Sequence, residues 1–163
     1  MPRRSTNDYL KPDLAEPLPH GQAETLARLV SYAGNPHHKR NPGNFGLKPP
    51  SAPRLDRSLC DDVSIFKREE ATRLLREGAR RSMISRTRTP NGDWPKQIWA
   101  VTDSGRVVEA RIDNQVQGSY HGYPMEPNNP HAALVFEKWH ERSPPAAPPI
   151  PSGRKVRIRK DRP

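Results

Sequence analysis

The stretch "WPKQIWAVTDSGRVVEARIDNQVQGSYHGYPM", residues 94–125, decides the fold, because it holds most of the β-forming residues and two of the three tryptophans. Residues 97–102, 107–112 and 119–125 each show the period-two pattern or the composition of a short strand. "DSG" joins the first two strands as a compact turn in which Gly105 can take a positive φ, and "DNQVQG" is a looser second turn. The stretch therefore predicts a three-stranded antiparallel meander.

The alternation within this meander predicts two unlike faces. In residues 107–112, Val108, Ala110 and Ile112 point one way, whereas Glu109 and Arg111 point the other way. We expect the polar pair to share its face with either Tyr120 or His121 of the third strand, and helices to cover the opposite face. Residues 97–102 carry apolar side chains on both faces, which predicts a central strand.

Helical patterns flank the meander on both sides. Apolar residues spaced three and four apart predict helices over residues 22–33 and 67–81. A third helix is predicted after the meander, with Asn129 as its N-cap and Pro130 as its first residue, and we expect it on the apolar face of the sheet. The predicted fold is α+β, a single small domain of about three helices and a three-stranded sheet.

Proline and charge mark the ends of the chain. The 20 prolines gather mostly outside the helical and strand patterns, where they interrupt regular structure. We therefore predict a flexible N-terminal tail over residues 1–20, one domain over residues 21–142, and a disordered tail over residues 143–163 that is first Pro-rich and then basic. The domain core should be lean, since 32% of the residues are hydrophobic.

The positive charge predicts a polyanionic partner. The chain carries a net charge of +10, and its last thirteen residues, "PSGRKVRIRKDRP", contain six Lys or Arg and one Asp. Such a tail attracts phosphate backbones; the alternative is that it serves solubility alone. The candidate nucleic-acid-binding residues of the tail are Arg154, Lys155, Arg157, Arg159 and Lys160.

Several features bound the setting of the protein. The single cysteine, Cys60, excludes an internal disulfide, and no run of 18 apolar residues occurs, so the sequence predicts a cytoplasmic protein without a membrane partner. A free cysteine is more often a small buried hydrophobic residue than a nucleophile. No set of histidines with Cys60 has a standard zinc spacing, so we predict neither a metal nor a cofactor.

A second candidate region is the polar loop over residues 34–50. It places His37, His38, Lys39 and Arg40 side by side between two Asn-Pro pairs. A loop of this length in a small domain is usually either functional or disordered, and we expect an ordered functional loop.

The residue types in these two regions suit phosphodiester chemistry. Metal-free RNA cleavage needs a base for the 2′-hydroxyl, an acid for the leaving oxygen and a cation for the phosphate. The candidate catalytic residues are His38, Lys39, Glu109, Arg111 and His121, and the candidate nucleic-acid-binding residues outside the tail are His37, Arg40, Tyr120 and Tyr123. RNA is accordingly a more probable substrate than DNA.

Each of these residues also has a plainer interpretation. His121 can satisfy a buried hydrogen bond, and Tyr123 and Trp99 can be core residues rather than platforms for bases. Glu109 and Arg111, two apart on one strand, can form an ordinary surface ion pair. The cations Arg73, Arg76, Arg80 and Arg81 of the second helix can form a phosphate-facing ridge or a solvated face paired with glutamates.

A helix, a basic loop with His and Lys, and then a strand meander with polar residues on one face is similar to the small bacterial ribonuclease toxins of the barnase, colicin and RelE type. The resemblance covers residues 22–125, in arrangement and residue type, and it implies metal-independent RNA cleavage. The chain departs from that pattern in its long second helix before the sheet and another after it. "HHKRNPGNFG" and "YHGYP" also resemble signature stretches of a bacterial protein family.

The sequence thus predicts a small basic protein that acts on nucleic acid, most simply a metal-independent ribonuclease or toxin-like nuclease. The first alternative is a non-catalytic nucleic-acid-binding or accessory module. The second is an interaction protein, a subunit or inhibitor that binds a larger partner through its tails. A neutralising or complex-forming protein partner is compatible with each.

Overall fold

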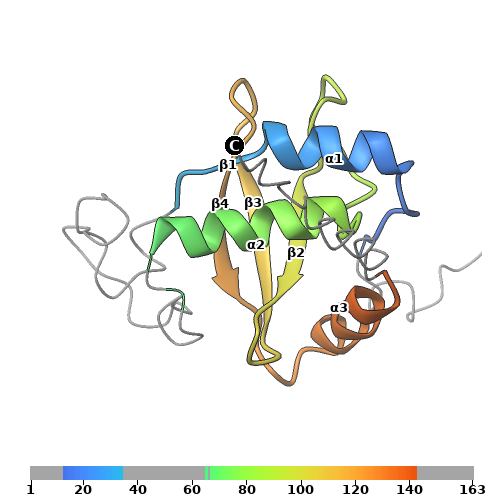
Figure 1. Cartoon of the computed structure of the whole chain (residues 1–163), viewed down its shortest axis with the longest axis vertical. Helices are drawn as coiled ribbons and strands as arrows, with labels where there is room; N and C mark the ends of the chain where they lie inside the picture. The colour runs from blue at the N-terminus through green and yellow to red at the C-terminus, as the bar shows by residue number, and fades with distance from the viewer. Residues whose placement is uncertain (1–12, 35–64, 66, 143–163) are drawn as a thin grey trace, which may run out of the picture.

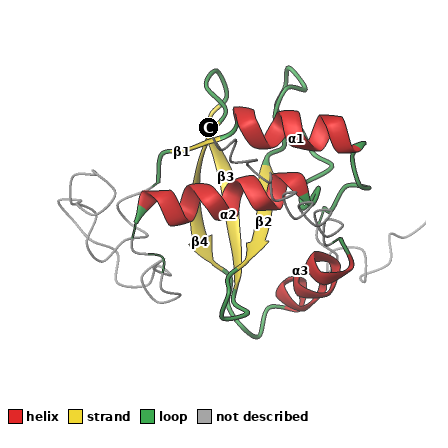
Figure 2. Ribbon diagram, in the orientation of Figure 1, coloured by secondary structure: helices red, strands yellow, loops and turns green. Residues whose placement is uncertain are grey.

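The structure is a computed structural model, and it describes residues 13–34, 65 and 67–142. The described part of the chain contains three helices and four strands (Figure 1, Figure 2). In chain order they are α1 (His20–Leu29), β1 (Ser31–Tyr32), α2 (Arg68–Arg80), β2 (Gln97–Val101), β3 (Val107–Asn114), β4 (Ser119–Pro124) and α3 (Pro130–Glu141).

The strands form one mixed sheet in the order β1-β4-β3-β2. β2 pairs with β3 and β3 with β4, both antiparallel, so the predicted meander is confirmed and the fold is α+β. The prediction of three strands is corrected, since β1 adds a fourth strand, parallel to β4. A two-residue strand leaves no periodic pattern in the sequence, which explains why it was not predicted.

The same correction shortens the first predicted helix. α1 begins at His20 and ends at Leu29 instead of covering residues 22–33, because the backbone of Val30 is already extended, with φ −67° and ψ 143°. The chain then enters β1, where the hydroxyl of Tyr32 accepts a hydrogen bond of 3.0 Å from the backbone N–H of Gly122. The second predicted helix, over residues 67–81, is confirmed as α2.

α2 lies across one face of the sheet and α1 packs against α2, as Figure 1 shows, and the core fills the space between these helices and the strands. Leu75 and Ala79 of α2 are buried against Ile98 of β2. Gly78 lets the two backbones approach closely, because a Cβ at that position would overlap the carbonyl oxygen of Trp99 and lie 2.9 Å from the Ile98 side chain. The prediction that helices cover one face is therefore confirmed.

The prediction that residues 97–102 form a central strand is wrong, since β2 is the last of the four strands in the sheet. Its outer edge is nevertheless paired. The N–H of Trp99 donates to the carbonyl of Met83 at 2.8 Å, and the N–H of Ser85 donates to the carbonyl of Gln97 at 2.9 Å. An antiparallel bridge between Ile84 and Ile98 belongs to this short pairing. β2 carries buried apolar side chains on both faces, and both α2 and α3 contact it.

α3 begins as predicted, with Asn129 as N-cap and Pro130 in the first turn. The helix does not join α1 and α2 on their face of the sheet, so its predicted position is corrected. It lies near the turn between β2 and β3, where Ala132 and Phe136 line a hollow together with Val107 and Met125 (Figure 1). Phe136 is consequently 42% exposed.

Residues 13–19, which the sequence assigned to the N-terminal tail, contact the segment before β2. Leu14 bridges to Ser85, and the N–H of Ala15 donates to the carbonyl of Ile84 at 2.9 Å. The guanidinium of Arg142 closes this region, since it donates to the carbonyls of Ser82 at 2.8 Å and Ala15 at 3.0 Å. Three segments that are distant in the sequence therefore meet at Arg142.

Candidate functional site

The face of the sheet opposite α1 and α2 carries a cluster of polar side chains. Register places Glu109 on β3 between Trp99 on β2 and Tyr123 on β4. Arg111, two residues along the same strand, lies between Gln97 and His121 in the same way. Side chains at these paired positions point to one face, so three strands contribute to one cluster.

Glu109 is the centre of this cluster. It is only 7% exposed, and its carboxylate accepts four hydrogen bonds from side chains. Oε1 accepts from Gln97 Nε2 at 3.1 Å, from Arg111 Nε at 2.9 Å and from the hydroxyl of Tyr123, and Oε2 accepts from Trp99 Nε1 at 2.9 Å. A buried carboxylate is stable only when such donors satisfy it.

These hydrogen bonds decide the charge state of the cluster. Burial by itself raises the pKa of Glu109, but the bonds from its four donors together outweigh burial and hold the pKa below its ordinary value. Burial, reinforced by the hydrogen bond to Glu109, raises the pKa of Tyr123. At neutral pH the cluster therefore contains a carboxylate and a protonated tyrosine.

Arg111 is the exposed cation of the cluster. Its side chain is 57% exposed, whereas the side chain of Glu109 is 9% exposed. The hydrogen bond to Glu109 is the main cause of the raised pKa of Arg111. Its guanidinium carbon lies 6.0 Å from the ring centre of Tyr123. The guanidinium also bonds to Tyr123. With more than half of its side chain exposed and five N–H donors in total, Arg111 still has donors for an anion.

The cluster forms the floor of an open groove of about 500 Å³. The walls come from the segment between β4 and α3, from the first turn of α3 and from residue 13. The residues that line the groove are Asp13, Gln97, Trp99, Glu109, Arg111, Tyr123, Pro124, Met125, Glu126, Asn129 and His131. His131 was not a candidate in the sequence, because no strand pattern or motif marked it.

The structure distinguishes the two candidates on the third strand. His121 pairs with Arg111 and shares its face, so this alternative is confirmed. Its Nδ1 lies 3.6 Å from Oδ1 of Asp113. The prediction for Tyr120 is corrected: it points to the opposite face, is 0% exposed and donates its hydroxyl proton to the carbonyl of Pro95 at 2.7 Å. Its ring is therefore a core element rather than a surface for a base.

The aromatic residues on the groove face differ in their burial. Trp99 is 2% exposed and is thus a core residue, as the plainer interpretation had it. Tyr123 is half-buried and lines the groove. The pair of Glu109 and Arg111 is more than a surface ion pair, since one partner is buried in a network of four donors.

The remaining candidates lie outside the described residues, and the prediction of an ordered loop at residues 34–50 is untested beyond residue 34. The undescribed candidates are His37, His38, Lys39, Arg40, Cys60, Arg154, Lys155, Arg157, Arg159 and Lys160.

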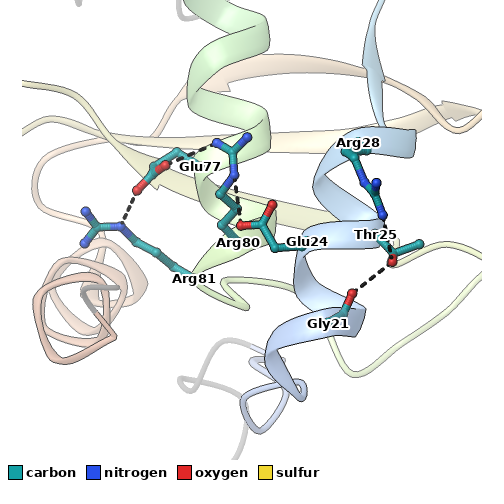
Figure 3. A network of polar contacts seen from close by, with 7 residues as sticks. All are labelled: Gly21, Glu24, Thr25, Arg28, Glu77, Arg80 and Arg81. Carbon is teal, nitrogen blue, oxygen red and sulfur yellow. Dashed lines mark hydrogen bonds and ion pairs between the residues drawn. The ribbon is translucent and has the colours of Figure 1, made fainter. Parts of the chain in front are cut away.

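The cations of α2 form a paired face rather than a free ridge (Figure 3). Arg80 lies 3.3 Å from Glu24 of α1 and 3.5 Å from Glu77, and Arg81 lies 3.0 Å from Glu77. Arg73 lies 3.6 Å from Asp103. Arg73, Arg80 and Arg81 are therefore paired with acidic residues. For these three residues the structure favours the paired face over the phosphate-facing ridge.

Within residues 13–34, 65 and 67–142, no three His, Cys, Asp or Glu side chains gather as the ligands of a metal ion would. No helix in this part of the chain combines the length and apolar character needed to span a membrane. Comparison with family models, with curated proteins and with solved structures finds no match for the chain.

Proposed function

We propose that this protein acts on nucleic acid and that the groove over Glu109 binds and cleaves RNA without a metal ion. The observation that carries the proposal is the arrangement of Arg111, a largely exposed guanidinium fixed by a buried carboxylate on the floor of a groove. A guanidinium whose position is fixed in advance binds a phosphate with less loss of side-chain entropy than a mobile one.

The charge of the chain supports a polyanionic ligand. A net charge of +10 attracts nucleic acid over a distance and accelerates encounter, although it does not select a sequence. Arg111 would then supply a specific contact in the groove, where it can stabilise the negative charge that develops on a phosphate during cleavage. Tyr123, half-buried at the same place, offers a ring beside that phosphate.

A second candidate is a non-catalytic nucleic-acid-binding module. The observation that favours it is the charge state of the cluster, because Glu109 has a lowered pKa and Tyr123 a raised one. Neither group titrates near neutral pH, where a proton-transferring group works best. In this case the cluster would serve only to hold Arg111 against a phosphate.

The third candidate, an interaction protein, is supported by an apolar hollow elsewhere on the surface. α1 and the residues that follow β3 border a hollow of about 1090 Å³ whose lining includes Leu18, Leu29, Trp94 and Val116. Leu29 is 58% exposed and Val116 is 91% exposed. Exposed apolar residues that cluster are typical of protein-binding surfaces.

An RNA-cleavage assay in EDTA separates the three candidates. We expect cleavage by the wild-type chain and a loss of about 10- to 100-fold in Arg111→Gln, since one charge-assisted contact to phosphate contributes about 1.5–3 kcal/mol. The matched control is Arg73→Gln, because Arg73 has a similar exposure of 58% but pairs with Asp103 on another face. Its activity should equal that of the wild type.

The other outcomes assign the protein to another class. RNA binding without cleavage, weakened by Arg111→Gln but not by Arg73→Gln, would establish the binding module. Neither cleavage nor binding would exclude both nucleic-acid candidates and leave the protein-interaction candidate.

A further inference from the structure

We propose that His131 is the catalytic base of the groove, an inference that rests on the proposed ribonuclease function. His131 lies in the first turn of α3 and lines the same groove as Arg111 and Tyr123. The residue is half-buried and contributes to the lining of the groove, so it is accessible from there. A base must lie within reach of the substrate that the cation binds, and His131 lines the same groove as that cation.

The other ionisable groups on the groove floor are already engaged with one another. Oε1 of Glu109 accepts from three donors, and Oε2 accepts from the indole of Trp99. A carboxylate with about four acceptor positions is then saturated. Tyr123 keeps its proton and donates it to Glu109. Arg111 is permanently charged.

The two carboxylates on the groove wall, Asp13 and Glu126, already have partners of their own. Both carboxylate oxygens of Asp13 are engaged, because Oδ2 accepts from Thr87 and Oδ1 lies 3.3 Å from Nε of Arg86. Histidine is the side chain that ordinarily exchanges a proton between pH 5 and 8. Of the described residues that line this groove, His131 is the one histidine.

The other described histidines of this half of the chain are placed differently. His121 shares the sheet face with Arg111, but its Nδ1 lies beside Asp113, and the residues lining the groove do not include it. His140, nine residues along α3, has its Nδ1 2.8 Å from the carbonyl of Phe136 and lines a separate hollow. The base therefore comes from α3 rather than from the strand that the sequence suggested.

Local structure fixes the backbone that carries His131. The side-chain oxygen of Asn129 accepts a hydrogen bond of 2.9 Å from the N–H of His131, and the ring of Pro130, the residue between them, fixes its own φ. The cap therefore holds the first turn of α3 at the groove without using the imidazole ring. The sequence "NPH" thus serves both as the start of a helix and as the support of a reactive side chain.

The reaction that this geometry supports is an internal transfer at phosphorus. The neutral ring of His131 takes the proton of the 2′-hydroxyl, and the 2′-oxygen forms a bond to phosphorus. The bond from phosphorus to the 5′-oxygen breaks, and that oxygen leaves with a proton from water. The hydroxide that remains takes the proton held by the His131 ring, which restores the base. The products are a 2′,3′-cyclic phosphate and a free 5′-hydroxyl. Arg111 stabilises the charge on the non-bridging oxygens during the transfer.

The test compares His131→Ala with His140→Ala in the full chain, in EDTA, on RNA. We expect kcat to fall about 10²- to 10⁴-fold in His131→Ala, with KM and RNA binding within about twofold of the wild type. Added imidazole should restore part of the lost activity by filling the space left by the ring. His140→Ala, on the same helix but in another hollow, should retain full activity.

The two proposals fail in distinguishable ways. A wild-type chain that does not cleave RNA would overturn the ribonuclease and the base assignment together. A wild-type chain that cleaves, with His131→Ala equally active, would overturn the base assignment alone. If kcat falls in His131→Ala but imidazole restores nothing and thermal unfolding shifts downward, the role is structural and the assignment is wrong.

Discussion

At the scale of single residues, Glu109 determines how the groove can work. A carboxylate that is 7% exposed and surrounded by four donors acts on its neighbours rather than directly on a ligand. It fixes Arg111 on one side and the hydroxyl of Tyr123 on the other. Glu109 is therefore a positioning residue in the proposed mechanism, and its contribution should be visible in stability as well as in activity.

Replacing Glu109 by Gln should make the stability of the protein less dependent on pH. A carboxyl group whose pKa in the folded state lies below its ordinary value of 4.5 contributes stability above that value and loses it as the pH falls through the folded pKa. We expect Glu109→Gln to be less stable than the wild type by about 1–3 kcal/mol at pH 7, with a smaller difference at pH 3. Urea unfolding of both proteins at pH 7 and at pH 3 measures this difference in the free energy of unfolding. A difference in stability of the same size at the two pH values would contradict the conclusion that Glu109 is ionised in the folded protein.

The residue scale also shows how far the sequence predicts the site. The period-two pattern of β3 correctly placed Glu109 and Arg111 on one face. It could not decide between Tyr120 and His121, because the pairing of β3 with β4 shifts between Ile112 and Asn114 and a shift of one residue exchanges the faces. The choice depends on that irregularity, which has no marker in the sequence.

At the scale of elements, the contact between α2 and β2 is set by a glycine rather than by a large apolar side chain. Gly78 lies in the last turn of α2, and glycine within a helix is unfavourable by up to about 1 kcal/mol relative to alanine. The close approach of the β2 backbone explains its presence, because no Cβ fits there. The apolar stripe of α2 predicted which face is buried, but not how near the sheet comes.

We expect Gly78→Ala to destabilise the protein by about 1–3 kcal/mol despite the better helix propensity of alanine, because the added Cβ must push α2 away from β2. Gly21→Ala is the matched control, since Gly21 is also helical but nothing lies within 4 Å of an added Cβ. That variant should be unchanged or up to about 1 kcal/mol more stable. Denaturant unfolding measures the free energy of unfolding of both variants. If Gly78→Ala is as stable as the wild type, α2 can shift away from β2 without loss of stability, and the prediction is wrong.

Elements that lack a periodic pattern were the ones that the sequence did not predict. β1 has two residues, and Leu14 enters the sheet region through a single bridge to Ser85. Both depend on pairing with partners far along the chain, which leaves no local pattern. α3 has the predicted N-cap and apolar residues at helical spacing. Its position at the end of the sheet depends on the path of residues 125–129, and the helical periodicity of α3 carries no information about that path.

At the scale of the whole molecule, the groove and the basic C-terminal residues contribute differently to the proposed binding of RNA. The groove offers one largely exposed guanidinium, whereas the last thirteen residues carry six Lys or Arg and one Asp. Contacts of basic residues with phosphates release counterions, so each one adds to the dependence of affinity on salt. The number of counterions released when RNA binds is therefore larger for many basic residues in the last thirteen positions than for a single contact at Arg111.

Removal of residues 151–163 should therefore change the salt dependence of RNA binding far more than Arg111→Gln does. For a single strand each neutralised phosphate contributes about 0.7 to the slope of log affinity against log salt. We expect the truncated chain to lose about 3–4 from this slope and Arg111→Gln to lose about 1 or less, as measured by fluorescence anisotropy from 50 to 300 mM salt. Cleavage at saturating RNA should survive the truncation, because the groove is intact, and should fall in Arg111→Gln. The opposite pattern, with activity lost on truncation and retained in Arg111→Gln, would place the reactive site outside the groove.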